Sequence, residues 1–183
     1  MSAASEGLVE IVSGDLRVAV AAAPPAMLGL YRRHAELVED FPGDDADGFA
    51  FAAVGDGTHD WPGLVVTQRY SPAGPGFPPG VLLVPKRRQV FLGAGTRLLA
   101  YEARSGAWRR QWQDEAALGF WQWRRHGRVA LMSAELELAA WTTDGEKLWS
   151  TAVEPPWSYG VDAGEVVLDV MGEIRTFGLT TGP

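Results

Sequence analysis

The sequence predicts a mainly β protein made of repeated antiparallel meanders, with one short helix near the N-terminus. Residues 80–183 show a threefold self-similarity. The chain also consists largely of short runs of Val, Leu and aromatic residues bounded by Gly, Pro and charged residues, which is typical of strands joined by tight turns. Helical spacing of apolar residues occurs in a single N-terminal segment. A β-sandwich is the alternative architecture for the same strands.

The repeat can be counted from three valines, Val90, Val129 and Val166, taken as equivalent. A leucine stands two positions after each valine and a glycine sixteen positions after it. These glycines are Gly106, Gly145 and Gly182. Glycine suits this place because a tight hairpin turn needs a residue that tolerates positive φ.

Three units follow from this alignment, at about 80–113, 119–153 and 157–183. In the first two units we expect four strands each, and in the third unit three strands. The expected strands of the first two units are 80–84, 89–92, 96–102, 108–112, 119–123, 128–132, 136–141 and 146–153.

Two segments carry a resemblance to a known family. They are residues 99–108, LAYEARSGAW, and residues 138–149, LAAWTTDGEKLW. Their order of strand, turn, Gly and Trp resembles the repeats of quinoprotein-type (PQQ-like) β-propellers. The resemblance implies blade-like sheets, in an incomplete or unusually small propeller, because a closed propeller takes about four to eight blades. It implies no cofactor, since the metal and quinone ligands of the enzymes in that family have no counterpart here.

The N-terminal part, 1–79, is less regular. Residues 8–12 and 16–22 read as a hairpin. Pro24 and Pro25 end the second strand and open a helix that we expect to continue through Glu39. The acidic run 39–47 reads as an exposed loop, 49–54 and 63–70 as strands, and 71–80 as an irregular connection.

The third unit lacks a fourth strand, so one of its edges needs a cover. We expect the strand 63–70 to pair with this last unit. The alternative is that open edges meet another copy of the chain, giving a homo-oligomer.

Composition sets the outer bounds of the interpretation. The 183 residues are expected to form a single domain. No apolar run approaches the roughly 20 residues that span a bilayer, and the N-terminus has no signal-peptide pattern, so we expect a soluble, cytoplasmic protein without a membrane partner. The chain has no cysteine, which excludes disulfides and thiolate metal sites. Its net charge of −7 argues against nucleic acid as the main partner.

Two groups of residues are candidate binding sites. Corresponding turns of the first two units hold the basic residues Lys86, Arg87, Arg88, Arg124, Arg125 and Arg128. If the sheets stack, both turns share one rim, which could bind phosphate, an acidic partner or nucleic acid. Solvated turns balanced by nearby acidic residues explain these charges as well. Trp121 and Trp123 share one strand face and could stack on a sugar or a base, although packing between sheets explains them as well.

Other chemistry finds little support in the sequence. The three histidines, His34, His59 and His126, have no metal-binding spacing. His59 followed by Asp60 is a weak acid–base pair, because neighbouring residues on a turn usually point apart. Six carboxylates could pair only through folding: Asp56, Asp60, Glu135, Glu137, Asp162 and Asp169. We therefore assign no catalytic residue, no metal and no cofactor.

The function that fits best is a non-catalytic module that binds a protein partner through its β-repeat surface. The alternative is a binder of small ligands or carbohydrates that uses exposed tryptophans. An enzyme of unrecognised type is a third, less favoured interpretation.

Overall fold

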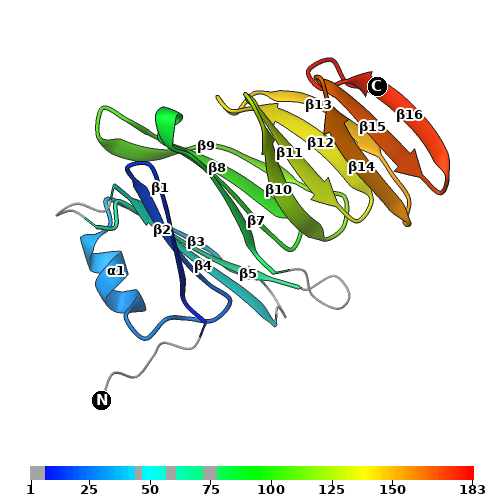
Figure 1. Cartoon of the computed structure of the whole chain (residues 1–183). Helices are drawn as coiled ribbons and strands as arrows, with labels where there is room; N and C mark the ends of the chain where they lie inside the picture. The colour runs from blue at the N-terminus through cyan, green and yellow to red at the C-terminus, as the bar shows by residue number, and fades with distance from the viewer. Residues whose placement is uncertain (1–6, 44–46, 57–60, 72–77) are drawn as a thin grey trace.

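Four β-sheets stack on one another in the computed structural model, which describes residues 7–43, 47–56, 61–71 and 78–183 (Figure 1). We name them sheets A to D in chain order. Hydrophobic clusters fill each of the three layers between neighbouring sheets. The protein is therefore mainly β, as the sequence predicted.

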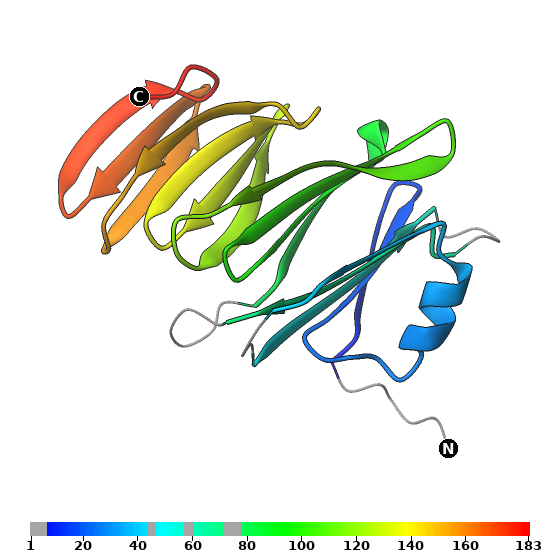
Figure 2. The same cartoon turned by 180° about the vertical axis from the view of Figure 1, so that it is seen from behind.

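Sheet A has the strand order β1-β2-β4-β5-β3. Its strands are β1 (Val9–Ser13), β2 (Leu16–Ala21), β3 (Leu37–Phe41), β4 (Gly48–Gly55) and β5 (Leu64–Tyr70). The predicted hairpin is present, since β1 and β2 pair antiparallel. The one α-helix of the described residues, α1 (Leu28–His34), covers the face of sheet A that points away from the other sheets (Figure 2). There Tyr31 packs on Phe51.

The predicted helix was too long at its C-terminal end. Helix α1 stops at His34, and residues 37–41 form strand β3, parallel to β5. In β3, Leu37 and Phe41 pack into the layer against sheet B, while Val38 is exposed. This alternation has the period of two that a half-buried strand needs. The helix expected through Glu39 and the acidic loop expected from residue 39 therefore both overlap β3.

The predicted partner of strand 63–70 was wrong. Strand β5 lies inside sheet A, antiparallel to β4 and parallel to β3, and so has both edges paired. It has no edge left for sheet D, and sheets A and D stand at opposite ends of the stack (Figure 1).

Sheets B, C and D are antiparallel meanders, as expected for blade-like units. Sheet B consists of β6 (Gly80–Val84), β7 (Gln89–Ala94), β8 (Arg97–Arg104) and β9 (Ala107–Glu115). Sheet C consists of β10 (Phe120–His126), β11 (Val129–Ala134), β12 (Glu137–Thr142) and β13 (Lys147–Ala152). Sheet D has three strands, β14 (Trp157–Asp162), β15 (Glu165–Val170) and β16 (Glu173–Gly178).

The alignment of the three valines slips by one residue in the second unit. Val90 packs toward sheet A and Val166 packs toward sheet C, so each faces the preceding sheet. Val129 packs toward sheet D, the following sheet, and its neighbour Ala130 faces sheet B. Because side chains alternate between the faces of a strand, a shift of one residue reverses the face. Ala130 is therefore the structural equivalent of Val90 and Val166.

The third strands of the meanders give a better alignment. Leu98, Leu138 and Ile174 hold one equivalent position, and Ala100, Ala140 and Thr176 hold the position two residues later. Next to these, Tyr101, Trp141 and Phe177 each face the preceding sheet. In the part of the chain that the structure describes, no helix has the length and apolar character to cross a membrane.

Candidate functional site

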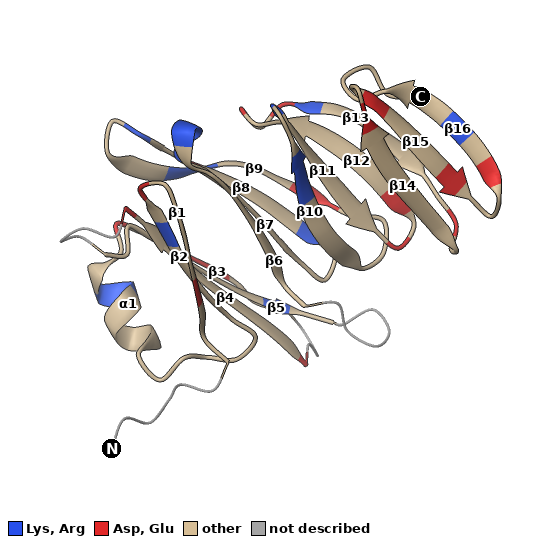
Figure 3. Ribbon diagram, viewed as in Figure 1, with Lys and Arg blue, Asp and Glu red and all other residues tan. Residues whose placement is uncertain are grey.

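The predicted basic residues lie at turns of sheets B and C that neighbour each other, and blue segments mark these turns in Figure 3. Lys86, Arg87 and Arg88 lie at the turn between β6 and β7, where residues Pro85–Arg87 form a 3-10 turn, η1. Arg124 and Arg125 lie at the end of β10 and Arg128 precedes β11. We call these six residues the basic rim.

A shared carboxylate joins the two halves of the basic rim. The Nε atom of Arg87 is 3.1 Å from Asp144 Oδ1, and the Nη2 atom of Arg128 is 3.2 Å from Asp144 Oδ2. Arg87 belongs to sheet B, and Arg128 and Asp144 belong to turns of sheet C. Equivalent turns of neighbouring sheets therefore lie within side-chain reach of each other.

Half of the basic rim is neutralised by the protein itself. Besides the two arginines at Asp144, Arg88 lies 3.4 Å from Asp15 and 3.8 Å from Asp56. Such exposed ion pairs contribute little to stability, about 0–1 kcal/mol each. They do hold the three guanidinium groups in place.

The other half of the basic rim has no carboxylate partner among the residues that the structure describes. Lys86, Arg124 and Arg125 are exposed. Arg125 donates from Nε to the carbonyl oxygen of Gly127 at 2.9 Å, and Arg124 lies over the ring of Tyr159 at 5.9 Å. These three cations can bind an acidic group on another molecule. Further along the stack, sheet D has the acidic residues Asp162 and Glu165 at its corresponding turn, so the basic rim is confined to sheets B and C.

Trp123 lies inside the layer between sheets B and C. Its ring centroid is 5.3 Å from Phe91, 5.7 Å from Phe120 and 5.4 Å from Trp141, and only 9% of the residue is exposed. The protein's own aromatic rings therefore occupy the surroundings of Trp123, and the structure offers a ligand no exposed face of this ring.

Trp121, the other predicted stacking residue, is half-buried at a register shift in β10. Its ring stacks on Trp157 of sheet D, with centroids 5.2 Å apart and planes at 11°. One ring face thus contacts a neighbouring sheet. Stacking of a sugar or base on this residue stays a prediction.

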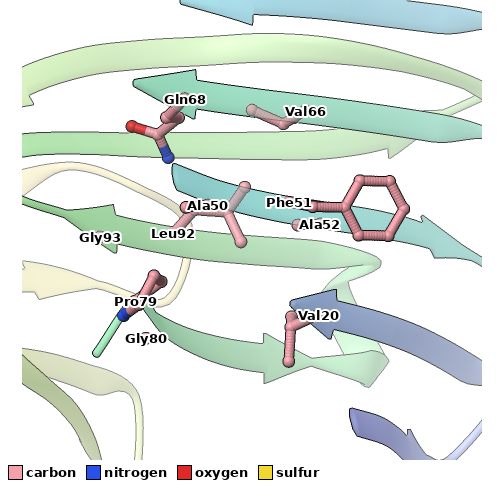
Figure 4. A pocket seen from close by; sticks show the side chains of 10 residues that line it. All are labelled: Val20, Ala50, Phe51, Ala52, Val66, Gln68, Pro79, Gly80, Leu92 and Gly93. Carbon is pink, nitrogen blue, oxygen red and sulfur yellow. The ribbon is translucent and has the colours of Figure 1, made fainter. Parts of the chain in front are cut away.

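A small cavity lies between sheets A and B, lined mostly by apolar side chains (Figure 4). Its volume of about 20 Å³ is close to the space that one buried water molecule needs. Gln68 lines it and is 3% exposed, and its Oε1 atom has no hydrogen-bond partner among the described residues. The dimensions suit a bound water molecule rather than an organic ligand.

The remaining candidate residues do not converge. His34 is exposed on α1, whereas His126 is half-buried on β10 in another sheet. His59 and Asp60 lie outside the described residues. Glu137 accepts hydrogen bonds from Ser150 and from the backbone N–H of Ala117. Within the described ranges, no three His, Cys, Asp or Glu residues gather closely enough to hold a metal ion.

One polar contact was missed by the sequence analysis. The hydroxyl of Tyr101 in β8 donates to Glu39 Oε2 in β3 at 2.5 Å, and Arg110 lies 3.5 Å from the same oxygen. Burial, followed by the hydrogen bond and the negative charge of Glu39, raises the pKa of Tyr101 far above its ordinary value. The contact ties the edge of sheet A to sheet B. No sequence signal links these residues, because they are 62 positions apart.

Comparisons with known proteins show the fold but no family. No family model matches the chain, and no curated protein matches it. The crystal structure of BamB from Moraxella catarrhalis is similar, with a TM-score of 0.51 and 16% identity. The match covers 100% of this chain and 48% of BamB, so the chain spans about half the length of that β-propeller protein. At this identity the likeness supports a PQQ-like β-repeat fold and nothing finer.

Proposed function

We propose that the protein is an interaction module that binds a protein partner through the surface of its stacked β-sheets, with the basic rim as the contact. The observation that carries the proposal is the meeting of Arg87 and Arg128, from neighbouring sheets, at Asp144. These contacts join two turns into one continuous surface. Beside it lie Lys86, Arg124 and Arg125, which have no carboxylate partner within the described ranges.

The chemistry of this surface favours an acidic protein segment. Arginine binds carboxylates with two parallel hydrogen bonds, which gives both strength and orientation. The whole chain has a net charge of −7, so an acidic partner is repelled elsewhere and directed to the basic rim. Nucleic acid fits less well, because its phosphate backbone would meet the same negative field over a longer distance.

The test is a capture experiment with matched variants. The wild-type protein, Arg124→Gln/Arg125→Gln and Arg32→Gln/Arg33→Gln are immobilised and exposed to extract of the native host. Both double variants remove two adjacent arginines, but Arg32 and Arg33 lie on α1, at the far end of the stack. Thermal melts of all three proteins confirm that they remain folded.

We expect a protein that the wild type and the α1 variant retain and that the rim variant loses. Its binding should weaken as salt rises, because rim charges are screened. Failure to capture any protein, or equal capture by both double variants, contradicts the proposal.

A further inference from the structure

A second, larger hollow lies between sheets A and B, beside the turn that holds Arg88. Its volume of about 420 Å³ is within the range of roughly 300–1,000 Å³ that small-molecule sites take. Space remains between the two sheets here because Gly55, Gly63 and Ala103 line the hollow with little side chain. We call it the A–B hollow. Its polar lining consists of Glu36, Asp56, Arg88, Ser105 and Trp108.

Trp108 brings a buried hydrogen-bond donor to the A–B hollow. The residue is 7% exposed, and its indole N–H has no hydrogen-bond acceptor among the described residues. A Cβ atom on Gly63 would lie 2.6 Å from Nε1, so the backbone of Gly63 lies against this part of the ring. Because a buried donor without an acceptor is destabilising, the indole N–H favours a ligand that supplies an acceptor atom.

Glu36 brings a carboxylate to the same place. Its backbone N–H donates to the carbonyl oxygen of Gly63 at 2.9 Å, and Gly63 in turn lies against Trp108. Glu36 is exposed and forms no ion pair within the described ranges. An acceptor with a full negative charge and an indole donor therefore lie on neighbouring parts of the lining.

The charges around the A–B hollow favour a cationic group. Arg88 lies 3.4 Å from Asp15 and 3.8 Å from Asp56, and Glu36 adds a third carboxylate, so three negative charges surround one guanidinium. An anion would be repelled there. In the part of the chain that the structure describes, these carboxylates are not grouped closely enough to hold a metal ion. An organic cation that makes directed hydrogen bonds is the complementary ligand.

A sugar or a base fits the A–B hollow less well. Such ligands gain most of their affinity by stacking on an open aromatic face. Trp108 is too deeply buried to offer one, because the backbone of Gly63 covers part of its ring. What the indole does offer is its N–H, which needs a carbonyl or hydroxyl oxygen.

We propose that the A–B hollow binds a primary ammonium group that is followed by a carbonyl, as in an amino-acid amide or at the N-terminus of a peptide. The ammonium donates to Glu36 beside the charge of Asp56, and the carbonyl oxygen accepts from Nε1 of Trp108. Both ends of this short unit are thus matched by neighbouring groups of the lining. The hollow shares Arg88 with the basic rim but takes a ligand of opposite charge, so the inference goes beyond the proposed function and can fail without it.

The test follows the indole N–H signals of the isotopically labelled full chain. The chain has eight tryptophans, and the signal of Trp108 is assigned before titration. Alaninamide is added at about pH 6.5, where its amino group is protonated. N-acetylalaninamide keeps the carbonyl but lacks the ammonium, and propylamine keeps the ammonium but lacks the carbonyl.

We expect alaninamide alone, at millimolar concentration, to shift the signal of Trp108 and the backbone amide signals of Ser105 and Gly106. The absence of these shifts, or equal shifts with either control compound, overturns the proposal.

A matched pair of charge variants tests the role of Glu36. Glu36→Gln and Glu165→Gln each remove one exposed carboxylate, but Glu165 lies in sheet D. Glu36→Gln should bind alaninamide about tenfold more weakly or worse, because a charge-assisted hydrogen bond is lost, whereas Glu165→Gln should bind it as the wild type does. The rim variant Arg124→Gln/Arg125→Gln should also bind it unchanged, which separates this site from the basic rim. Equal affinity of Glu36→Gln and the wild type contradicts the assignment.

Two peptides distinguish the sources of the ligand. Trialanine presents the same ammonium and carbonyl at a peptide N-terminus, and acetylated trialanine lacks the ammonium. Binding of trialanine at least as tight as that of alaninamide, and lost on acetylation, supports a peptide N-terminus as the ligand. Binding of alaninamide but not of trialanine supports a free amino-acid derivative. If acetylated trialanine binds as well as trialanine, the ammonium is not recognised and the proposal is wrong.

Discussion

Replacement of Gly145 should destabilise the protein in two ways, through its left-handed backbone and through a steric overlap, and Gly106 has only the first of these. Gly145 lies in the turn between β12 and β13 with φ +90°, and Gly106 lies in the equivalent turn of sheet B with φ +88°. A Cβ atom on Gly106 would have no heavy atom within 4 Å, whereas on Gly145 it would overlap the side-chain amide of Gln111. The two positions therefore share the backbone cost and differ in the steric cost.

The magnitudes follow from the contacts of Gln111. A left-handed backbone costs a residue with Cβ about 1–2 kcal/mol, so Gly106→Ala should lower the free energy of unfolding by that amount. In Gly145→Ala the amide of Gln111 must move, and its Oε1 atom then loses the hydrogen bond from Gln89 Nε2 at 2.6 Å. Gln89 is 2% exposed, and an unsatisfied buried donor costs about 1–3 kcal/mol. We expect Gly145→Ala to cost at least about 1 kcal/mol more than Gly106→Ala.

Urea denaturation of both variants measures the difference directly. Gly145→Val should be worse than Gly145→Ala, because a β-branched residue tolerates positive φ least. In a Gln111→Ala background, where the obstructing amide is absent, the cost of Gly145→Ala should fall to that of Gly106→Ala. The reasoning is refuted if the alanine variants are equally stable in the wild-type background, or if the excess cost persists without Gln111.

Two other predictions concern the layers between the sheets. A Cβ on Gly93 would lie 2.6 Å from the ring of Phe120, so Gly93→Ala should destabilise the protein by about 1–3 kcal/mol. A Cβ on Gly160 would have no heavy atom within 4 Å, so Gly160→Ala should not destabilise it. Thermal melts that rank the two variants in the reverse order would contradict the packing. Tyr101 should stay neutral in the folded protein at high pH, because its pKa is raised, while in the unfolded chain it ionises near pH 10. The free energy of unfolding should then fall as pH rises above about 10, by up to about 1.4 kcal/mol per pH unit, and Tyr101→Phe should remove this part of the fall in denaturant titrations at pH 9 to 11. An identical pH slope in the variant would show that burial and Glu39 do not hold the phenol of Tyr101 neutral.

Strands and turns of sheets B to D were predictable because their information is local. The alternation of apolar residues and the positive-φ glycines of the turns act over a few residues. For this reason both ends of strand β6 were predicted correctly. The slip at Val129 shows the limit of this reasoning. A one-residue error in the alignment leaves the strand boundaries unchanged but reverses the face on which each side chain lies. Hydrophobicity could not reveal the error, because both Val129 and Ala130 are apolar.

The basic rim was likewise predictable in part. The sequence placed the arginines on equivalent turns, but it could not indicate that Asp144 lies between Arg87 and Arg128. It also left open whether Trp123 is exposed, because an aromatic ring is typical both of a packed layer and of a binding surface. The packing of sheet C on sheet B decided that question.

The sequence by itself determined the meanders of sheets B to D and their turns, since each depends on neighbouring residues. Only the tertiary structure decided the parallel pairing of β3 with β5, the contact of Glu39 with Tyr101 and the separation of sheets A and D at opposite ends of the stack. The physical reason is that these contacts join residues far apart in the chain. Their stability depends on which surfaces are buried together, and no local sequence pattern indicates which distant segments will pack on each other.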